Sequence, residues 1–174
     1  MAEIIEKDGC LLEGLRNNGV QAIAHCANAF CTMRSGVAAQ IKDQFPLAYQ
    51  ADLTTERGDK SKMGKYSVAE LVNGPRYHQQ IGNTHIYLPR YIFNIYGQYN
   101  YGYDGAQYVD YDALENGLKG VRNFMIIKSV LSLGLPHKIG CCRAGGNWSV
   151  IRPMIDRVFE KTKLKVIIYK FNRG

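Results

Sequence analysis

The sequence predicts an α/β fold in which helices cover both faces of one mixed β-sheet. Short apolar runs typical of strands alternate along the chain with segments of helical periodicity, and this alternation favours three layers. The 174 residues are 46% hydrophobic and 21% charged, which is enough apolar sequence for one substantial core. The sequence shows neither an internal repeat nor a linker, so we expect residues 1–174 to form a single domain.

The first third of the chain shows two strand patterns and two helical ones. The apolar run before Asn28 is typical of a buried strand, whereas the longer helical pattern ends at Pro46, which cannot continue a helix. Polar residues follow, among which Lys60, Lys62 and Lys65 are expected to be solvated. The predicted elements are a strand over residues 2–6, a strand over 21–26, a helix over 36–45, a short helix over 47–52 and a polar loop over 54–63.

Three short apolar runs come next, separated by Gly- and Pro-containing segments that typically end strands. We expect two of these runs to pair like a hairpin in the sheet. A Tyr- and Gly-rich loop then leads to a long helix, with Asp110 as its N-cap and Gly134 as its end. The predicted elements are strands over residues 66–72, 84–88 and 91–96, a loop over 97–110, a helix over 111–133, a strand over 137–141, a helix over 149–161 and a strand over 165–171.

Net charge indicates the sign of the partner. A formal charge of +7 and a pI near 9.2 favour an anion, but charge alone does not distinguish a nucleic acid, a nucleotide and a membrane surface. The sequence has no signal-peptide pattern and no apolar run near the roughly 20 residues of a membrane span. We therefore expect a monomer in the cytoplasm that does not bind membranes.

Cysteine usage indicates reduced thiols. Neither the vicinal pair Cys141 and Cys142 nor the spacing of Cys26 and Cys31 has neighbouring His ligands of the kind that zinc sites use. With Cys10 the chain has five cysteines, an odd number. We therefore expect no metal and no cofactor.

Two glycine-bearing loops carry the strongest functional pattern. The downstream loop, residues 140–148, leaves a predicted strand and enters a helix that begins near Trp148. The upstream loop, residues 28–38, follows the strand at 21–26 and leads into the helix at 36–45. Strand, glycine turn and helix start in that order bring backbone N–H groups and the positive end of a helix dipole to one point. Both loops therefore predict a site for a phosphate.

Several blocks of the sequence follow one another in the order of a known family. They are His25-Cys-Ala-Asn28, residues 33–38 and 40–46, Met63-Gly-Lys-Tyr66, Asn94-Ile-Tyr-Gly-Gln98, Ile139-Gly-Cys141, Ala144-Gly-Gly-Asn-Trp148 and Val166-Ile-Ile-Tyr169. In this order, and nearly from end to end, the chain resembles a macrodomain, and most closely the branch that includes ADP-ribose 1''-phosphate phosphatases. The resemblance implies the three-layer α/β/α macrodomain fold, with ADP-ribose or its 1''-phosphate as the ligand.

The resemblance implies a catalytic set of three residues, His25, Asn28 and Arg34. His25 resembles a histidine that acts on the terminal phosphate, and an ordinary pKa of about 6.5 suits such a role, although a histidine in an apolar strand is also a common core residue. Asn28 stands where the family contacts the distal ribose, with a turn-forming role as the alternative. Arg34 replaces a glycine of many relatives and is expected to reach an anion.

Ligand contacts are expected from both loops and from two further segments. Backbone N–H groups of the loops would bind the diphosphate, and Asn147 is also a good N-cap for the helix at Trp148, a residue that we expect to pack in the core. Asp8 is the candidate for the adenine amino group, although it stands two positions out of the family's register. The expected ligand-binding residues are Asp8, Cys10, Leu11, Asn28, Ser35, Gly36, Val37, Tyr96, Gly97, Gln98, Cys142, Arg143, Ala144, Gly145, Gly146 and Asn147.

The chain departs from relatives that cleave ADP-ribose from protein or DNA. Those relatives use a lysine near the block at 94–98 and, in some members, an acid in the downstream loop. Here Tyr96, Gly97 and Ala144 stand at those places. Asn147 stands where an aspartate is common, and an asparagine is not a general acid or base. These departures count against glycosidic cleavage by that route.

The leading hypothesis is a metal-independent phosphatase that converts ADP-ribose 1''-phosphate to ADP-ribose and phosphate. His25 would be its nucleophile or base, and the loop amides with Arg34 would stabilise the phosphoryl group. The alternatives are a non-catalytic ADP-ribose reader and an ADP-ribosyl hydrolase acting on modified protein, nucleic acid or acetylated ADP-ribose. Nucleic-acid binding through the basic surface and the tyrosines between Tyr96 and Tyr103 is less favoured.

Overall fold

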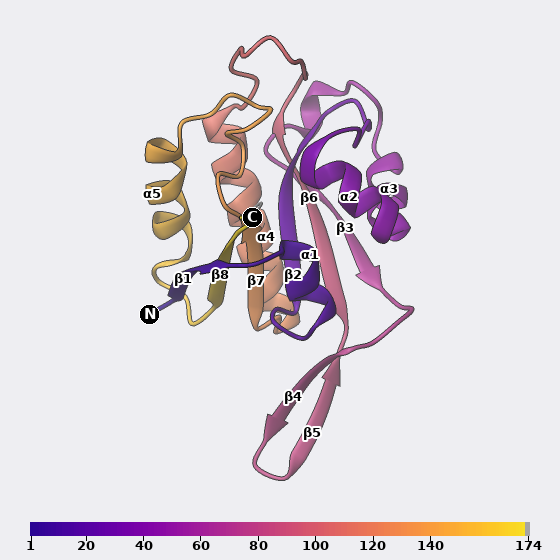
Figure 1. Ribbon diagram of the computed structural model, residues 1–174, viewed down its shortest axis with the longest axis vertical. Coiled ribbons are helices and arrows are strands. Elements are labelled where there is room, and N and C mark those ends of the chain that lie inside the picture. The colour runs from indigo at the N-terminus through magenta and orange to yellow at the C-terminus, as the bar shows by residue number, and fades with distance from the viewer. Residues whose placement is uncertain (173–174) are drawn as a thin grey trace.

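The computed structural model describes residues 1–172, in which helices lie on both sides of a six-stranded sheet (Figure 1). The elements in chain order are β1 (Glu3–Asp8), α1 (Leu11–Arg16), β2 (Ala22–Asn28), α2 (Gly36–Gln44), α3 (Pro46–Leu53), the 3₁₀ turn η1 (Lys60–Lys62), β3 (Tyr66–Leu71), β4 (Tyr77–Ile81), β5 (Thr84–Leu88), β6 (Arg90–Gln98), α4 (Tyr111–Lys128), β7 (Ser132–Pro136), α5 (Trp148–Phe159) and β8 (Lys165–Lys170).

The sheet is mixed, as the sequence predicts. Its strands follow the order β1-β8-β7-β2-β6-β3, and each neighbouring pair is parallel except β6 with β3, which is antiparallel. The central strands β7, β2 and β6 are almost entirely buried, because helices cover both of their faces. Since these three strands are parallel, their carboxyl ends meet at one edge of the sheet.

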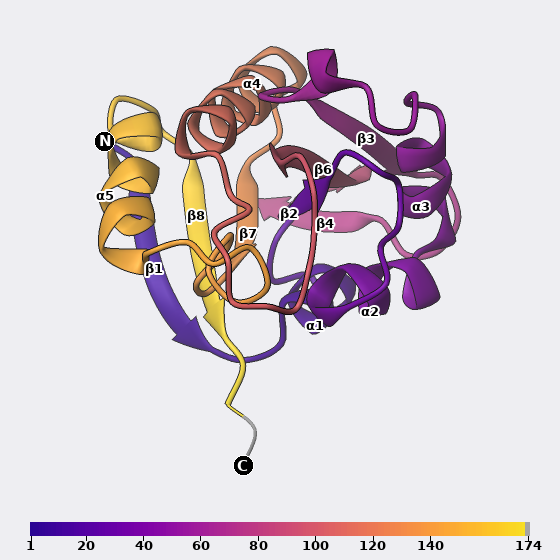
Figure 2. The same ribbon diagram turned by 90° about the horizontal axis from the view of Figure 1, so that it is seen from above.

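Two apolar clusters fill the space between the sheet and the helices. Phe93 and Leu118 belong to the cluster under α4 and α5, while Ile92 and Leu15 belong to the cluster under α1, α2 and α3. Figure 2 shows α4 and α5 on one side of the sheet and α1, α2 and α3 on the other. The three-layer α/β/α prediction is confirmed. None of the helices within residues 1–172 is long and apolar enough to cross a membrane.

The segment between β3 and β6 leaves the sheet as a separate ribbon. β4 pairs antiparallel with β5, and this ribbon projects from the body of the molecule (Figure 1). The hairpin-like pair expected in the sheet is β3 with β6, whereas the apolar run at 84–88 lies in the ribbon. The sequence analysis missed β4, because its residues Tyr-His-Gln-Gln-Ile are mostly polar. It also missed α1, which is only six residues long.

The long helix α4 ends five residues earlier than predicted. Ser129 adopts a left-handed backbone with φ of 55°, and the N–H group of Val130 donates to the Met125 carbonyl at 2.8 Å. This is the usual way in which a helix ends at a residue of positive φ. Ile126 and Ile127, in the last turn of the helix, are 55% and 78% exposed, whereas Val130 and Leu133, which follow the helix, are buried.

The strand expected at residues 137–141 is wrong. The strand in this part of the chain is β7, which pairs with β2 and β8, and residues 137–141 form turns. The predicted helix over 111–133 included only the first two β7 residues, Ser132 and Leu133, and residues 134–136 were assigned to no element. In the structure the buried, consecutive residues of β7 contact helices on both faces of the sheet, so a periodicity of 2 is not visible in them.

Both long helices of the second half begin at the predicted N-caps. The Asp110 side chain accepts a hydrogen bond from the N–H of Ala113 at 3.0 Å, and the Asn147 side chain accepts one from Ser149 at 2.9 Å. Each bond satisfies an N–H group that has no partner within its helix. Trp148 is half-buried and packs against the cluster under α4 and α5, as expected.

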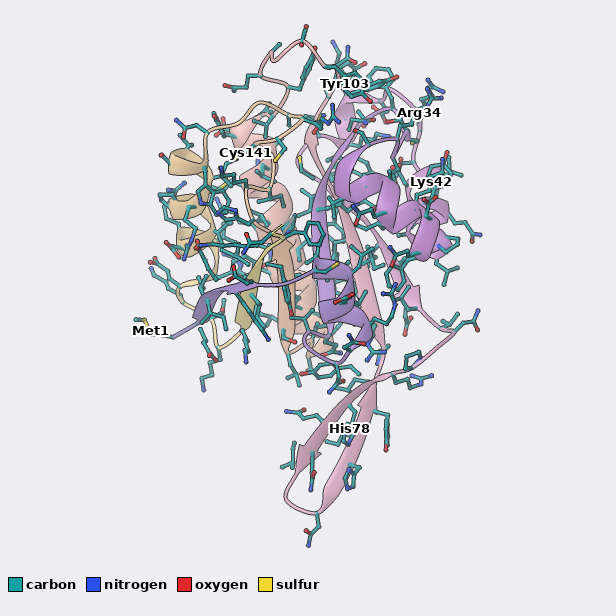
Figure 3. All side chains as sticks on the ribbon, in the orientation of Figure 1. Met1, Arg34, Lys42, His78, Tyr103 and Cys141 are labelled. Atoms are coloured by element: carbon teal, nitrogen blue, oxygen red, sulfur yellow. The ribbon has the colours of Figure 1, made fainter. Side chains whose placement is uncertain are left out.

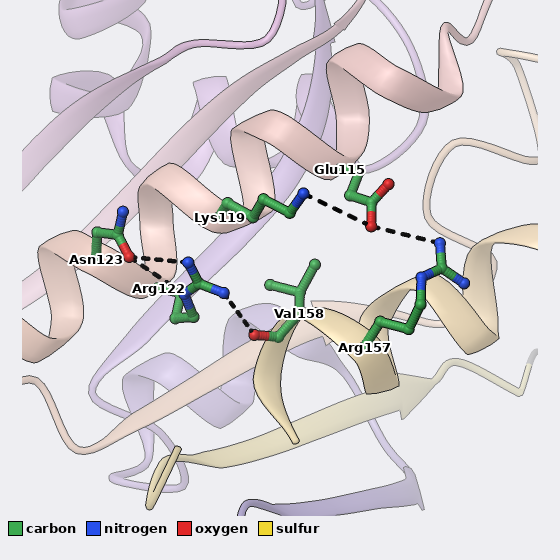
Figure 4. A network of polar contacts seen from close by, with 6 residues as sticks. All are labelled: Glu115, Lys119, Arg122, Asn123, Arg157 and Val158. Atoms are coloured by element: carbon green, nitrogen blue, oxygen red, sulfur yellow. Dashed lines mark hydrogen bonds and ion pairs between the residues drawn. The ribbon is translucent and has the colours of Figure 1, made fainter. Parts of the chain in front are cut away.

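Polar contacts join α4 to α5 on the outer surface of the protein (Figure 4). Oε1 of Glu115 lies 3.9 Å from Nζ of Lys119 and 3.4 Å from Nη2 of Arg157. Nη1 of Arg122 donates to the carbonyl of Val158 at 3.0 Å. Exposed pairs of this kind contribute at most about 1 kcal/mol each. The buried apolar cluster therefore determines how the two helices pack.

Gly117 marks the closest approach of α4 to the sheet. A Cβ added there would lie 2.3 Å from Cγ2 of Ile95, a stiff side chain with no exposed surface. We expect Gly117→Ala to lower the free energy of unfolding by about 2 kcal/mol, even though alanine is the better helix former. Urea denaturation measures the change. Asn123→Ala, on the exposed side of α4, is the control; equal stability of both variants would contradict the close approach.

Candidate functional site

A cavity of about 400 Å³ lies at the carboxyl ends of the central strands. Its walls are the upstream loop, the downstream loop with the turn that precedes it, and residues 101–103 of the loop after β6. Arg34, Tyr103 and Cys141 mark this end of the molecule in Figure 3. Open α/β sheets bind their ligands at this edge, so the cavity is the candidate functional site.

Asn28 turns the chain at the end of β2. Its Oδ1 accepts from the N–H of Phe30 at 2.8 Å, and its Nδ2 donates to Oγ1 of Thr32 at 2.8 Å. Farther along the loop, Cys31 and Met33 adopt left-handed φ values of 55° and 42°, which are costly for residues with a side chain. Asn28 lines the cavity, but its amide is engaged within the loop. The turn-forming role is therefore the one that its contacts show.

The upstream loop presents the start of α2 to the cavity. Ser35 is the N-cap residue, and its side chain makes no capping hydrogen bond. The N–H groups of Gly36, Val37 and Ala38 have no acceptor within residues 1–172, and Ala39 is the first to donate, to the Ser35 carbonyl. All three line the cavity. The helix start therefore offers three free donors and the positive end of its dipole.

The downstream loop offers a second set of donors. Cys142, Arg143 and Ala144 line the cavity, and in the described part of the chain their N–H groups have no acceptor. Gly140 makes the preceding turn with a φ of 74°. The cavity is thus bordered by two runs of three consecutive unpaired N–H groups, one from each loop.

The remaining downstream residues do not line the cavity, contrary to expectation. The N–H of Gly145 donates to the Cys141 carbonyl at 3.1 Å, that of Gly146 to the Gly140 carbonyl at 2.9 Å, and that of Asn147 to the Tyr111 hydroxyl at 3.0 Å. Their donors are therefore used within the protein. These three residues shape the loop and begin α5 instead.

Cationic side chains surround the cavity. Arg34, Lys138 and Arg143 are among its lining residues, together with His137. The Arg143 guanidinium lies 4.7 Å from the centre of the ring of Tyr103, which also lines the cavity. A site with this many cations and free N–H groups favours a ligand with more than one negative charge.

Asp52 is the acidic residue among those that line the cavity, and the sequence analysis did not single it out. It lies in the last turn of α3 and is 1% exposed. Its Oδ1 accepts from the Tyr96 hydroxyl at 2.7 Å, whereas its buried Oδ2 has no donor among residues 1–172. Burial raises the pKa of Tyr96, so the phenol stays protonated and donates. One carboxylate oxygen of a residue that lines the cavity is therefore buried without a donor from the described residues.

His25, for which the sequence predicts a catalytic role, does not line the cavity. Its side chain has no exposed surface, and its Nε2 lies 2.7 Å from Oδ1 of Asn94. Nδ2 of Asn94 donates to the Ala48 carbonyl, so Oδ1 accepts and the proton of His25 is on Nε2. The other nitrogen, Nδ1, is buried without a partner in the described part of the chain, and burial lowers the pKa of His25. The histidine is a core residue.

Other expected ligand contacts are also absent from the cavity lining. Asp8 is exposed at the end of β1, Cys10 precedes α1, and Leu11 is buried in the core. Tyr96 lies buried beneath the cavity, where it holds Asp52. Gly97 packs against the Cys26 thiol and allows the close contact of β6 with β2. Eight of the expected site residues line the cavity: Arg34, Ser35, Gly36, Val37, Gln98, Cys142, Arg143 and Ala144. Their contacts with a ligand stay a prediction.

Lys62 is buried, whereas the sequence analysis expected it to be solvated. Its Nζ donates to Oγ1 of Thr55 and to the Glu56 carbonyl, both at 2.9 Å, and lies 3.5 Å from Sγ of Cys31. It is also 4.8 Å from the centre of the Tyr96 ring. The lysine therefore supports the loop beneath the cavity. Within residues 1–172 no group of three or more His, Cys, Asp or Glu side chains is placed to hold a metal ion.

Comparison with solved structures identifies the fold. The macrodomain of Thermus aquaticus DarG superposes with a TM-score of 0.70 at 24% identity, over 97% of this chain and 99% of that one. Thermosipho africanus DarTG, solved in complex with ADP-ribose, gives a TM-score of 0.70 at 18% identity, over 99% of this chain and 42% of that one. The fold is the macrodomain fold, which confirms the fold expected from the sequence motifs.

Comparison of sequences places the chain in a family. It is 34% identical over 146 residues to the uncharacterized 17.5 kDa protein in the tk-vs intergenic region of Enterobacteria phage T4, covering 83% of this chain and 84% of that protein. The human ADP-ribose glycohydrolase OARD1 is 22% identical over 148 residues, 85% of this chain and 80% of that protein. No family model matches the sequence. The chain belongs to the same family as the phage T4 protein.

The buried imidazole of His25 makes stability depend on pH. Because its pKa is lower in the folded protein than in the unfolded chain, the unfolded chain takes up a proton first as the pH falls. We expect the free energy of unfolding to decrease below about pH 6.5, with a slope approaching 1.4 kcal/mol per pH unit.

Urea denaturation at pH 7.5 and pH 5 tests this expectation. His25→Gln keeps a donor for Asn94 but does not titrate, so the difference between the two pH values should shrink. His78→Gln, on the exposed β4–β5 ribbon, is the matched control and should behave like the wild type. An unchanged pH dependence in His25→Gln would contradict the assignment.

Proposed function

We propose that the protein binds ADP-ribose in the cavity at the carboxyl ends of β2, β6 and β7. The proposal depends on the two runs of unpaired N–H groups, residues 36–38 and 142–144. A diphosphate carries two negative charges and many acceptor oxygens, and protein loops commonly bind it through such N–H groups without a metal. Arg34 and Arg143 add charge-assisted hydrogen bonds at the same cavity.

The rest of the cavity suits the nucleoside and ribose parts of the same ligand. Gln98 lines the cavity with an amide that uses one donor on the Asn100 carbonyl at 3.0 Å and keeps further capacity for hydroxyl groups. Tyr101 and Tyr103 provide aromatic surface. Two similar proteins support the proposal, since DarTG is solved with ADP-ribose and OARD1 is named an ADP-ribose glycohydrolase.

Arg143 tests the binding mode. We expect ADP-ribose to bind in isothermal titration calorimetry, and Arg143→Leu to weaken binding about 10-fold, since a charge-assisted hydrogen bond is lost. Arg76→Leu, at an exposed arginine of the β3–β4 connection, is the control and should bind like the wild type. Equal loss in both variants would indicate an effect of net charge alone. Absence of ADP-ribose binding by the wild type would refute the proposal.

A second proposal concerns hydrolysis at the terminal ribose, and the unpaired Oδ2 of Asp52 favours it. The negative carboxylate of Asp52 would weaken the binding of a phosphate to the nearby N–H groups. Its position in the cavity lining therefore suggests a role other than ligand binding. A buried carboxylate with a free oxygen is a candidate general base. The phosphatase expected from the sequence then needs Asp52 as its base, because His25 does not line the cavity.

For ADP-ribose 1''-phosphate the step is as follows. Oδ2 of Asp52 takes a proton from a water molecule, and the water oxygen bonds to phosphorus as the bond from phosphorus to the C1'' oxygen breaks. The departing ribose oxygen takes a proton from solvent, which leaves ADP-ribose and inorganic phosphate. The loop N–H groups and Arg34 stabilise the charge on the phosphoryl oxygens. Acetylated ADP-ribose and ADP-ribosylated protein or DNA are the alternative substrates for the same base.

Mass spectrometry of products from a panel of these four substrates, in the presence of EDTA, tests hydrolysis. We expect Asp52→Asn to lower kcat about 100-fold or more while ADP-ribose still binds, since Tyr96 keeps an acceptor oxygen. His25→Gln should keep kcat within about 3-fold. If the wild type binds ADP-ribose and releases no product from any substrate, the protein is a reader. Loss of turnover in His25→Gln alone would restore the histidine as the catalytic group.

A further inference from the structure

A second cavity, of about 510 Å³, lies at the opposite edge of the sheet. It forms where α1 ends, α2 meets α3, and β3 leads toward the β4–β5 ribbon. Arg90 at the start of β6 lines it, whereas Gln98 at the end of β6 lines the first cavity. The two residues are eight positions apart in one strand, which is roughly 26 Å at a rise of about 3.3 Å per residue. The cavities share no lining residue.

The walls of the second cavity are mostly apolar, and its volume is in the range of small-molecule sites. Gln44, Asn73, Gly74 and Arg16 complete the lining. Arg16 donates to Oε1 of Gln44 and lies over the Phe45 ring at 5.4 Å. The apolar wall residues are Leu15, Phe45, Pro46, Leu47, Leu71 and Pro75.

One buried cation faces these apolar walls. Arg90 is 4% exposed, and its Nη1 donates to the Pro75 carbonyl. Its Nε is buried without an acceptor, and its Nη2 has none within residues 1–172. No carboxylate of the described chain lies within ion-pair distance of Arg90. A charge removed from water without a partner is strongly unfavourable, so an anion at this position would stabilise the fold.

The free edge of the guanidinium indicates which anion fits. Nε and Nη2 point the same way from the planar group, and together they bind the two oxygens of one carboxylate. The Nη1 side is already used by Pro75. One buried positive charge balances one negative charge, and the apolar walls suit a hydrocarbon body. We infer that this cavity binds a monocarboxylate with an aliphatic or aromatic body, independently of the ADP-ribose site.

The experiment uses 3-phenylpropionate and octanoate as probes and 3-phenylpropanol as the uncharged match of the first. We expect both acids, at millimolar concentration, to raise the Tm of the wild type and to bind in titration calorimetry, while the alcohol and inorganic phosphate bind at least 10-fold more weakly. The Kd for ADP-ribose should not change in the presence of either acid. A failure of ADP-ribose to bind would therefore leave the monocarboxylate inference standing. A failure of the acids to bind would likewise leave the ADP-ribose proposal standing.

Two variants of Arg90 separate binding from a structural role. Arg90→Met should abolish the response to the acids, and its Tm without ligand should equal or exceed that of the wild type, because the unpaired charge is gone. Arg90→Lys keeps the charge but not the two-pronged edge, and should weaken acid binding about 10-fold. Arg76→Met, at the exposed neighbouring arginine, is the control and should bind both acids like the wild type.

Three results would overturn the inference. One is equal binding of the alcohol and the acid, which would mean that Arg90 does not contribute. Another is undiminished acid binding by Arg90→Met, or by Arg90→Lys should the methionine variant fail to fold. The third is the absence of any response of the wild type to either acid.

Discussion

The parallel pairing of β2 with β6 is the constraint on which the rest of the structure depends. Residues 22–27 of β2 pair in register with residues 91–96 of β6, and the register shifts only at Asn28. Both strands are buried on both faces, so they must end together at one edge, where polar groups can reach a ligand. The upstream loop turns at that edge because Asn28 bonds back to Phe30 and Thr32. The cavity thus begins where the pairing ends.

A buried polar network links this edge to the helices on one face. His25 contacts Asn94, Asn94 donates to Ser67, and Ser67 contacts Tyr96, which donates to Asp52. Most polar atoms in the network are paired, as buried groups must be. Nδ1 of His25 and Oδ2 of Asp52 are the exceptions. The first lies in the core, whereas the second belongs to a residue that lines the cavity, which is why Asp52 is the proposed general base.

The protein presents positive charge in two different ways. At the first cavity, backbone N–H groups supply donors that need no counter-ion, and Arg34 and Arg143 line the same cavity. This arrangement suits a ligand with several charges spread over many oxygens. At the second cavity the guanidinium of Arg90 is buried among apolar side chains, whereas the other arginine of the lining, Arg16, is exposed. A site of that kind selects a small, planar, singly charged group.

The sequence by itself determined the alternation of strands and helices, the N-caps Asp110 and Asn147, and the two loops that border the cavity, because these follow from local periodicity and local hydrogen bonds. Only the tertiary structure decided which polar residues face the ligand. In β2, a strand buried on both faces, the residues next to His25 in the sequence are apolar, so no pattern shows that its side chain points into the core. Asp52 lies on a different element, and it reaches the site only because α3 packs over β3 and β6. Sequence periodicity predicts whether a residue is buried, but not which residues it packs against.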